Sequence, residues 1–261
     1  MSDAILSTPA FVEQYGTGKP VTLFAHGFGG SIRDTRPFGT GVSGTRAFMH
    51  FRGHGGRPAP SSRWTYEELA GELRAAADGV EATRALGVSM GAGALARMLA
   101  DSPDRFEKAA FVLPAVLDGT TRSAGRTRMM SRVDRMVELA ARHDTAGIAQ
   151  QLALREPEEV RAVPAAQAWF EHQAELIVNS DARFGLTLPS ERAVDSAAAL
   201  GAVQARTLVL THEDDEAHPV EVAEAYAAAL PNAELVVLPA GSILWLGRSK
   251  IREIINGFLN D

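Results

Sequence analysis

One serine lies between two glycines in the stretch Gly87-Val88-Ser89-Met90-Gly91. An apolar run (85–88) precedes it, and a segment of Ala, Leu and Met with helical spacing (95–100) follows. A serine on a sharp turn between a strand and a helix can act as a nucleophile, because the turn exposes its hydroxyl group and the glycines avoid steric clashes. The five-residue pattern alone is also compatible with a glycine-rich turn in which serine caps a helix. The flanking strand and helix favour the nucleophile.

Two further loops follow apolar runs and are rich in glycine and histidine. His26-Gly27-Phe28-Gly29-Gly30 comes after the run 21–25, and Gly53-His54-Gly55-Gly56 comes after the run 45–51. A third loop, 211–219, follows the run 207–210 and carries Glu213, Asp214 and Asp215. Taken alone, its carboxylates could form a solvated loop that caps the next helix.

The elements that must position these residues alternate along the chain. Strands are predicted at 21–25, 45–51, 85–88, 108–113, 207–210 and 234–238, with a further edge strand at 10–15. Helices are predicted at 65–80, 95–100, 219–230 and 250–259. This alternation predicts an α/β fold with a mostly parallel sheet flanked by helices, whose sites lie at the carboxyl ends of the strands.

The middle of the chain contains no convincing strand. Helices are expected at 128–142, 144–154, 156–163 and 165–178. We therefore expect a core formed by 1–117 and 201–261, with 118–200 inserted as a helical cap, or lid, over the strand ends. The alternative is a helical bundle that contributes only to stability. The large apolar side chains of this segment are expected in its core more than in a pocket wall: Met129, Met130, Met136, Trp169, Phe170 and Phe184.

Composition excludes several classes of protein. The 261 residues carry a net charge of −6, so nucleic acid is not an expected partner. The absence of cysteine excludes a thiol nucleophile and disulfides, and is compatible with a cytoplasmic protein. The first residues, Met1 to Leu6, do not resemble a signal peptide, and no run is long enough for a membrane span. No set of histidines has the spacing of metal ligands, so no metal is expected.

The order of these motifs resembles the α/β-hydrolase fold over nearly the whole chain. The resemblance implies that Ser89 is the nucleophile and that the amides of Phe28 and Met90 form an oxyanion hole. It also implies an acid on the loop 211–219, where Asp215 is favoured and Asp214 is the alternative. The expected activity needs no cofactor.

The resemblance breaks at the catalytic base. Members of the family carry a histidine after the last strand, where this chain has Ser242 in the segment Pro239-Ala240-Gly241-Ser242-Ile243, and no histidine follows His218. We therefore expect an incomplete triad and weak or absent hydrolysis, because a serine hydroxyl is a poor nucleophile without a base.

Other histidines are alternative bases. His54 lies on a loop at the rim of the expected site, His212 and His218 flank the expected acid, and His172 is on a predicted lid helix. His26 is expected to be structural. His212 and His218 are disfavoured because a residue on the acid loop would approach the nucleophile from the wrong side.

The sequence thus predicts an enzyme for carboxylic esters or related acyl compounds. An apolar pocket near Phe28 and Trp245 would suit a small hydrophobic substrate. Two alternatives remain: a ligand-binding pseudo-hydrolase that lacks turnover, and a non-hydrolytic enzyme such as a cyclase or lyase.

Overall fold

The computed structural model describes residues 11–121 and 124–261. Its centre is a seven-stranded sheet in the order β1-β3-β2-β4-β5-β6-β7, in which β1 is antiparallel to β3 and the other neighbours are parallel. The strands are β1 (Phe11–Tyr15), β2 (Val21–Ala25), β3 (Thr45–His50), β4 (Arg84–Val88), β5 (Lys108–Val112), β6 (Arg206–His212) and β7 (Ala233–Leu238). The predicted α/β fold class is confirmed. Residues 1–10, including the start that was compared with a signal peptide, lie outside the described residues.

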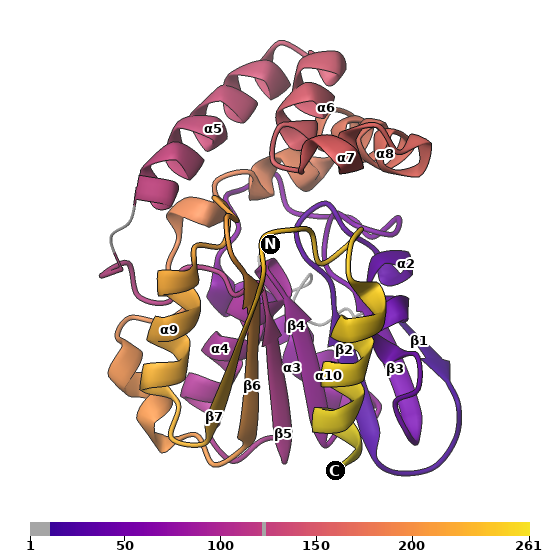
Figure 1. The fold of residues 1–261 in the computed structure, drawn as a ribbon, viewed down its shortest axis with the longest axis vertical. Coiled ribbons are helices and arrows are strands. Elements are labelled where there is room, and N and C mark those ends of the chain that lie inside the picture. Colours follow the sequence, from indigo (N-terminus) through magenta and orange to yellow (C-terminus); the bar gives the residue numbers. More distant parts are fainter. Residues whose placement is uncertain (1–10, 122–123) are drawn as a thin grey trace.

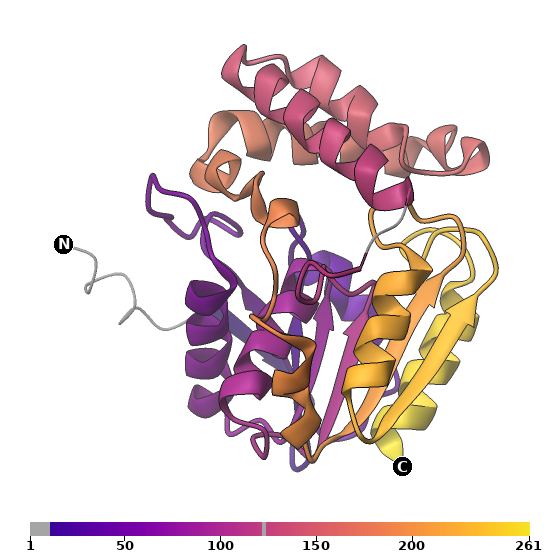
Figure 2. The ribbon, with the colours of Figure 1, turned by 90° about the vertical axis from the view of Figure 1, so that its left-hand side faces the viewer.

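Helices cover both faces of the sheet (Figures 1 and 2). One face packs against α3 (Tyr66–Gly79), α4 (Met90–Asp101), η4 (Ala197–Ala202) and α9 (Val220–Ala229). The other packs against α2 (Ile32–Thr35), η1 (Arg36–Gly39) and α10 (Arg248–Asn260). Because both faces are covered, strands β2 and β5 are buried along their whole length, as their apolar sequences require.

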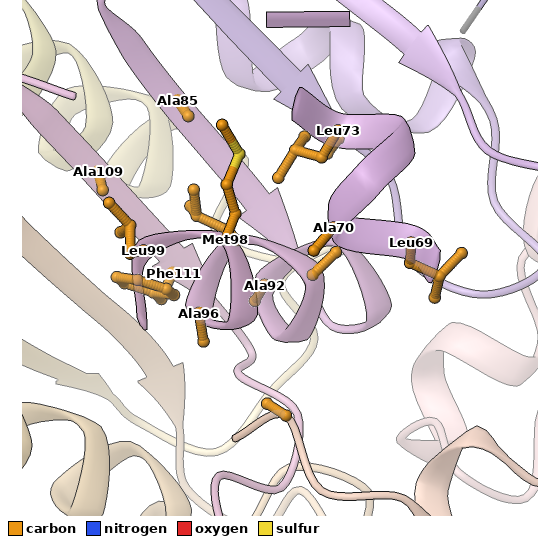
Figure 3. Packing of buried hydrophobic residues seen from close by; sticks show 14 of the residues in the cluster. Leu69, Ala70, Leu73, Ala85, Ala92, Ala96, Met98, Leu99, Ala109 and Phe111 are labelled. Carbon is orange, nitrogen blue, oxygen red and sulfur yellow. The ribbon is translucent and has the colours of Figure 1, made fainter. Parts of the chain in front are cut away.

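Helix α4 lies directly behind the serine turn and is held tightly. Figure 3 shows its side chains, among them Ala92 and Ala96, packed between α3 and the strands β4 and β5. Small alanine side chains let the helix approach the sheet closely, and Met98 and Leu99 fill the remaining space with fully buried side chains. The turn at the start of α4 therefore rests on a rigid base.

The helical segment 124–190 lies above the carboxyl ends of the strands (Figures 1 and 2). It contains α5 (Ala124–Ala141), α6 (Thr145–Ala153), α7 (Glu158–Arg161), α8 (Pro164–Asn179), η2 (Asp181–Gly185) and η3 (Leu188–Ser190). It has an apolar cluster of its own, which includes Leu139, Ile148 and Phe170. The division into a core and a cap stays a prediction. No helix in the described ranges is long and apolar enough to cross a membrane.

Candidate active site

Ser89 occupies a strained turn between β4 and α4. Its backbone has φ 50° and ψ −106°, a conformation that non-glycine residues rarely adopt. The Ser89 amide donates to the Val112 carbonyl at 2.9 Å, and the Ser89 carbonyl accepts from the Gly93 amide at 3.0 Å. These bonds to β5 and α4 hold the strained residue in place, with its side chain at the wall of a cavity.

The two glycines of the motif are required by close packing. A Cβ atom at Gly87 would overlap the Gly91 carbonyl group, and a Cβ atom at Gly91 would lie 2.5 Å from the Ala25 carbonyl oxygen. Only glycine fits where the turn passes so close to its own next residues and to the end of β2.

An imidazole lies beside the serine hydroxyl. His218 Nε2 is 2.8 Å from Ser89 Oγ, and His218 Nδ1 is 2.8 Å from Asp215 Oδ2. The expectation that Ser89 has no neighbouring base is therefore wrong. The argument that a residue on the acid loop would approach Ser89 from the wrong side is wrong as well. The three residues follow one another along the chain as Ser89, Asp215 and His218, which is the order Ser, Asp, His that the fold uses.

A tight turn brings Asp215 and His218 together. Asp215 Oδ1 accepts from the amides of Ala217 at 2.8 Å and His218 at 3.1 Å, which folds the chain back over the carboxylate. The His218 ring then reaches Asp215 Oδ2 on one side and Ser89 on the other. The sequence signal that was available is Asp215-x-x-His218 directly before Pro219 at the start of α9.

Asp215 is ionised over the ordinary pH range. Burial alone would raise the pKa of its carboxyl group, but the adjacent His218, together with Arg155 and His212, lowers that pKa well below its usual value. The ionised carboxylate favours the proton on His218 Nδ1, so that Nε2 presents a lone pair to the Ser89 hydroxyl.

Ser242 occupies different surroundings from those expected of a base. It is buried in the loop after β7, near the carboxyl group of Glu156 from the helical segment. Burial raises the pKa of Glu156, while the nearby Ser242 hydroxyl opposes this rise. A serine side chain cannot serve as a general base near neutral pH.

The histidines of the glycine-rich loops form hydrogen bonds with backbone groups. His26 Nε2 accepts from the Phe51 amide at 3.2 Å, and its Nδ1 donates to the Gly27 carbonyl at 2.7 Å, which agrees with a structural role. His54 Nε2 accepts from the Gly29 amide at 2.9 Å, so His54 is not a replacement base. Burial lowers the pKa of His54 to about 4 and lowers that of His26 well below its usual value. Both rings are therefore neutral supports of the loop that carries Phe28.

The remaining candidates have no hydrogen bond to Ser89. His212 donates from Nδ1 to the Glu213 carbonyl at 2.7 Å, and its Nε2 lies 3.5 Å from Asp215 Oδ2. Asp214 is exposed in a left-handed conformation with φ 60°, and His172 is on the exposed side of α8. Among these candidates, Asp215 and His218 are the pair that is hydrogen-bonded in series to Ser89.

The cavity around Ser89 has a volume of about 190 Å³ and mostly apolar walls. Phe28 and Met90, whose amides were expected in the oxyanion hole, both line it. Met129, Met136 and Trp169 line it as well, whereas they were expected mainly in the core of the helical segment; Met130, Phe170 and Phe184 do not. Trp245, expected near the same pocket, lines a neighbouring cavity instead.

Helix α5 is bound to the loop that carries Asp215 and His218. Glu216, between them in sequence, pairs with Arg128 at 2.5 Å and with Arg132 at 2.9 Å. The start of α5 also packs closely on this loop, since a Cβ atom at Gly125 would lie 3.2 Å from Pro219 Cγ. The helical segment therefore contacts the proposed catalytic loop directly.

Comparison with known proteins agrees with this architecture. No curated protein sequence matches the chain. Among solved structures, an esterase from Exiguobacterium antarcticum is 18% identical with a TM-score of 0.76, over 97% of this chain and 96% of the other. A bromoperoxidase from Bacillus anthracis is 20% identical with a TM-score of 0.79, over 98% of both chains. A thermophilic esterase from Thermogutta terrifontis is 22% identical with a TM-score of 0.76, over 96% of this chain and 93% of the other.

These identities are low, so the likeness concerns the fold. The family model described as the alpha/beta hydrolase fold matches residues 20–245, which contain Ser89, Asp215 and His218. The chain belongs to the α/β-hydrolase family.

Proposed function

We propose that the protein is a serine hydrolase of carboxylic esters or related acyl compounds. Ser89 is the nucleophile, His218 the general base and Asp215 the residue that orients and stabilises the imidazole. The observation that carries the proposal is the 2.8 Å distance between His218 Nε2 and Ser89 Oγ, with His218 Nδ1 at 2.8 Å from Asp215 Oδ2.

In the first half of the reaction, Ser89 Oγ attacks the substrate carbonyl carbon while His218 Nε2 takes the hydroxyl proton. The tetrahedral oxyanion is stabilised by the amides of Phe28 and Met90, each worth roughly 3–4 kcal/mol in the transition state. The C–O bond to the alcohol breaks, and His218 returns the proton to the leaving oxygen. The product of this half is an acyl group on Ser89.

The second half repeats the chemistry with water. His218 takes a proton from a water molecule, which attacks the acyl carbon, and Ser89 Oγ leaves with that proton. Asp215, ionised throughout, stabilises the imidazolium ion that forms in both halves. No cofactor takes part in these steps.

The walls of the cavity support an apolar acyl group. Met129, Met136 and Leu152 come from the helical segment, and Val88 and Leu113 come from the ends of the sheet. Such walls favour an uncharged aliphatic chain next to the reacting carbonyl. The helical segment acts in this proposal as a lid that completes the acyl pocket.

The alternatives considered from the sequence, a pseudo-hydrolase and a cyclase or lyase, depended on the absence of a base. The imidazole of His218 beside Ser89 removes that premise, and with it the reason to expect feeble hydrolysis.

Hydrolysis of p-nitrophenyl butyrate by the purified chain tests the proposal, together with labelling by a fluorophosphonate followed by intact-mass measurement. We expect turnover and a single adduct, both lost in Ser89→Ala. Ser242→His should bring no gain, because the base is already present. Absence of turnover and of adduct in the wild type, or turnover that survives Ser89→Ala, would overturn the proposal.

A further inference from the structure

A second cavity, of about 370 Å³, lies beside the one around Ser89. Helix α2 and η1 form one side, and the first turns of α10 form the other. Asp34, Phe38, Trp169, Ile243 and Leu244 line both cavities. The two cavities are therefore adjacent.

Three arginines surround this second cavity: Arg33, Arg248 and Arg252. In the part of the chain that the structure describes, none of them forms an ion pair with a carboxylate. Arg248 is held by its Nε bond to the Leu244 carbonyl at 2.6 Å and lies over the Trp245 ring at 5.3 Å from its centre. These two contacts fix the position of the Arg248 guanidinium group, and no carboxylate of the described residues neutralises its charge.

The carboxylate in the cavity wall, that of Asp34, already accepts hydrogen bonds from neighbouring groups. Asp34 Oδ2 accepts from the Ser31 amide at 2.7 Å and from the Ser31 hydroxyl at 3.0 Å, and Oδ1 accepts from Trp169 Nε1 at 3.1 Å. Three guanidinium groups against this single carboxylate leave the cavity with a net positive charge.

The N-terminal end of α10 adds to the positive charge of this cavity. Its N-cap is Gly247, no side chain caps its free amides, and its first turn contains no acidic residue. The positive end of the helix dipole and the charge of Arg248 repel each other, which costs stability unless an anion lies between them. An anion in the cavity would neutralise its unpaired guanidinium groups.

We propose that this cavity binds the anionic end, a carboxylate or a phosphate, of an acyl substrate whose ester carbonyl lies at Ser89. The inference rests on the proposed hydrolase function and specifies its substrate: an ester with an apolar acyl chain next to the carbonyl and a negative charge at the far end. Arg248 and Arg252 determine specificity, and Trp169 and Trp245 cover the apolar part of the ligand next to the anion.

Four p-nitrophenyl esters with six-carbon acyl chains test this. One ends in a carboxylate (the adipate monoester), one in the same carboxylate masked as a methyl ester, one in a phosphate ester, and one in a methyl group. We expect kcat/KM for at least one anionic ester to exceed that for the masked ester by tenfold or more, since hydrogen bonds between charged groups have this strength. The larger of the two anionic values identifies carboxylate or phosphate as the natural charge.

The double variant Arg248→Gln, Arg252→Gln is expected to lose this preference while hydrolysing the masked ester as the wild type does. The matched control is Lys250→Gln on the same helix, because Lys250 lies outside the cavity and pairs with Glu253 at 3.2 Å. The control should keep the preference. Equal kcat/KM for charged and masked esters, or a preference that survives in the double variant, would overturn the inference.

A binding measurement separates this inference from the hydrolase proposal. Hexanoic acid carrying a terminal phosphate is titrated into Ser89→Ala, and tryptophan fluorescence is recorded. Saturable binding that the arginine double variant weakens at least tenfold supports the site even if no ester is turned over. Binding that is absent, or unchanged in the double variant, overturns it even if neutral esters are hydrolysed.

Discussion

Replacing Asp215 by asparagine isolates the role of its charge, because the two side chains have the same shape. Asp215 Oδ1 accepts from the amides of Ala217 and His218, so the amide oxygen of asparagine must take that place. Its NH₂ group then faces His218 Nδ1, which lies 2.8 Å from Oδ2 in the wild type. This donor forces the imidazole into the tautomer with a lone pair on Nδ1 and a hydrogen on Nε2, which cannot take the proton of Ser89.

The expected loss follows from this inverted tautomer. A wrongly protonated histidine lowers kcat by about 10⁴-fold in a serine triad, or about 5.5 kcal/mol, with little effect on KM. Steady-state hydrolysis of p-nitrophenyl butyrate by Asp215→Asn measures it. Circular dichroism and thermal unfolding confirm that the variant is folded.

Asp214→Asn is the matched control. Asp214 is exposed at φ 60°, a conformation that asparagine tolerates, so this variant should keep wild-type kcat. A loss below tenfold in Asp215→Asn, or an equal loss in the control, would refute the assignment of the acid.

Two further predictions concern the supports of the site. His54 has a pKa of about 4 in the folded protein and about 6.5 when unfolded, so the unfolded chain binds more protons between these values. His54 should therefore contribute a fall of about 3 kcal/mol to the free energy of unfolding from pH 6.5 to pH 4. Urea titrations of His54→Gln over this range should show a free energy of unfolding that depends less steeply on pH than in the wild type, and the same pH dependence in both proteins would contradict this. Glu216→Gln removes the ion pairs with Arg128 and Arg132, and should lower kcat about fivefold with little change in KM, because the loop of Asp215 and His218 loosens. Glu138→Gln, which removes a pair within α5, should have no effect on kcat, and equal losses in both variants would count against a link between helix and loop.

The parts of the fold that local sequence determines were predictable. The glycines around Ser89 and the apolar runs before each loop predict a strand, a turn and a helix, because these preferences act within a few residues. Strand β5 and helix α10, for example, begin and end within about two residues of their predicted limits. The capping box of Thr65 and Glu68 likewise marks the start of α3 as predicted.

The position of His218 beside Ser89 was not predicted, for a reason that lies in the geometry of one loop. The usual position of the base, after β7, holds Ser242, and His218, three residues after Asp215, was disfavoured because the acid loop was expected to approach Ser89 from the wrong side. Whether the ring of His218 reaches Ser89 depends on the two amides that fold the loop over Asp215 Oδ1, and residue types alone do not determine that turn.

The pocket walls were unpredictable for another reason. Helical periodicity identifies the apolar face of α5, but it does not say what that face covers. Met129 and Met136 face the Ser89 cavity because the helical segment as a whole lies over the strand ends, which is a property of tertiary packing (Figure 2).

The claim on which this account depends is that the imidazole of residue 218 activates Ser89. The most direct measurement is kcat/KM for p-nitrophenyl butyrate in His218→Gln beside His212→Gln, since the His212 ring lies close to Asp215 but is not hydrogen-bonded to Ser89. We predict a loss of up to about 10⁶-fold in the first variant and less than tenfold in the second. Retention of more than one percent of wild-type activity in His218→Gln, or an equal loss in His212→Gln, would contradict the claim.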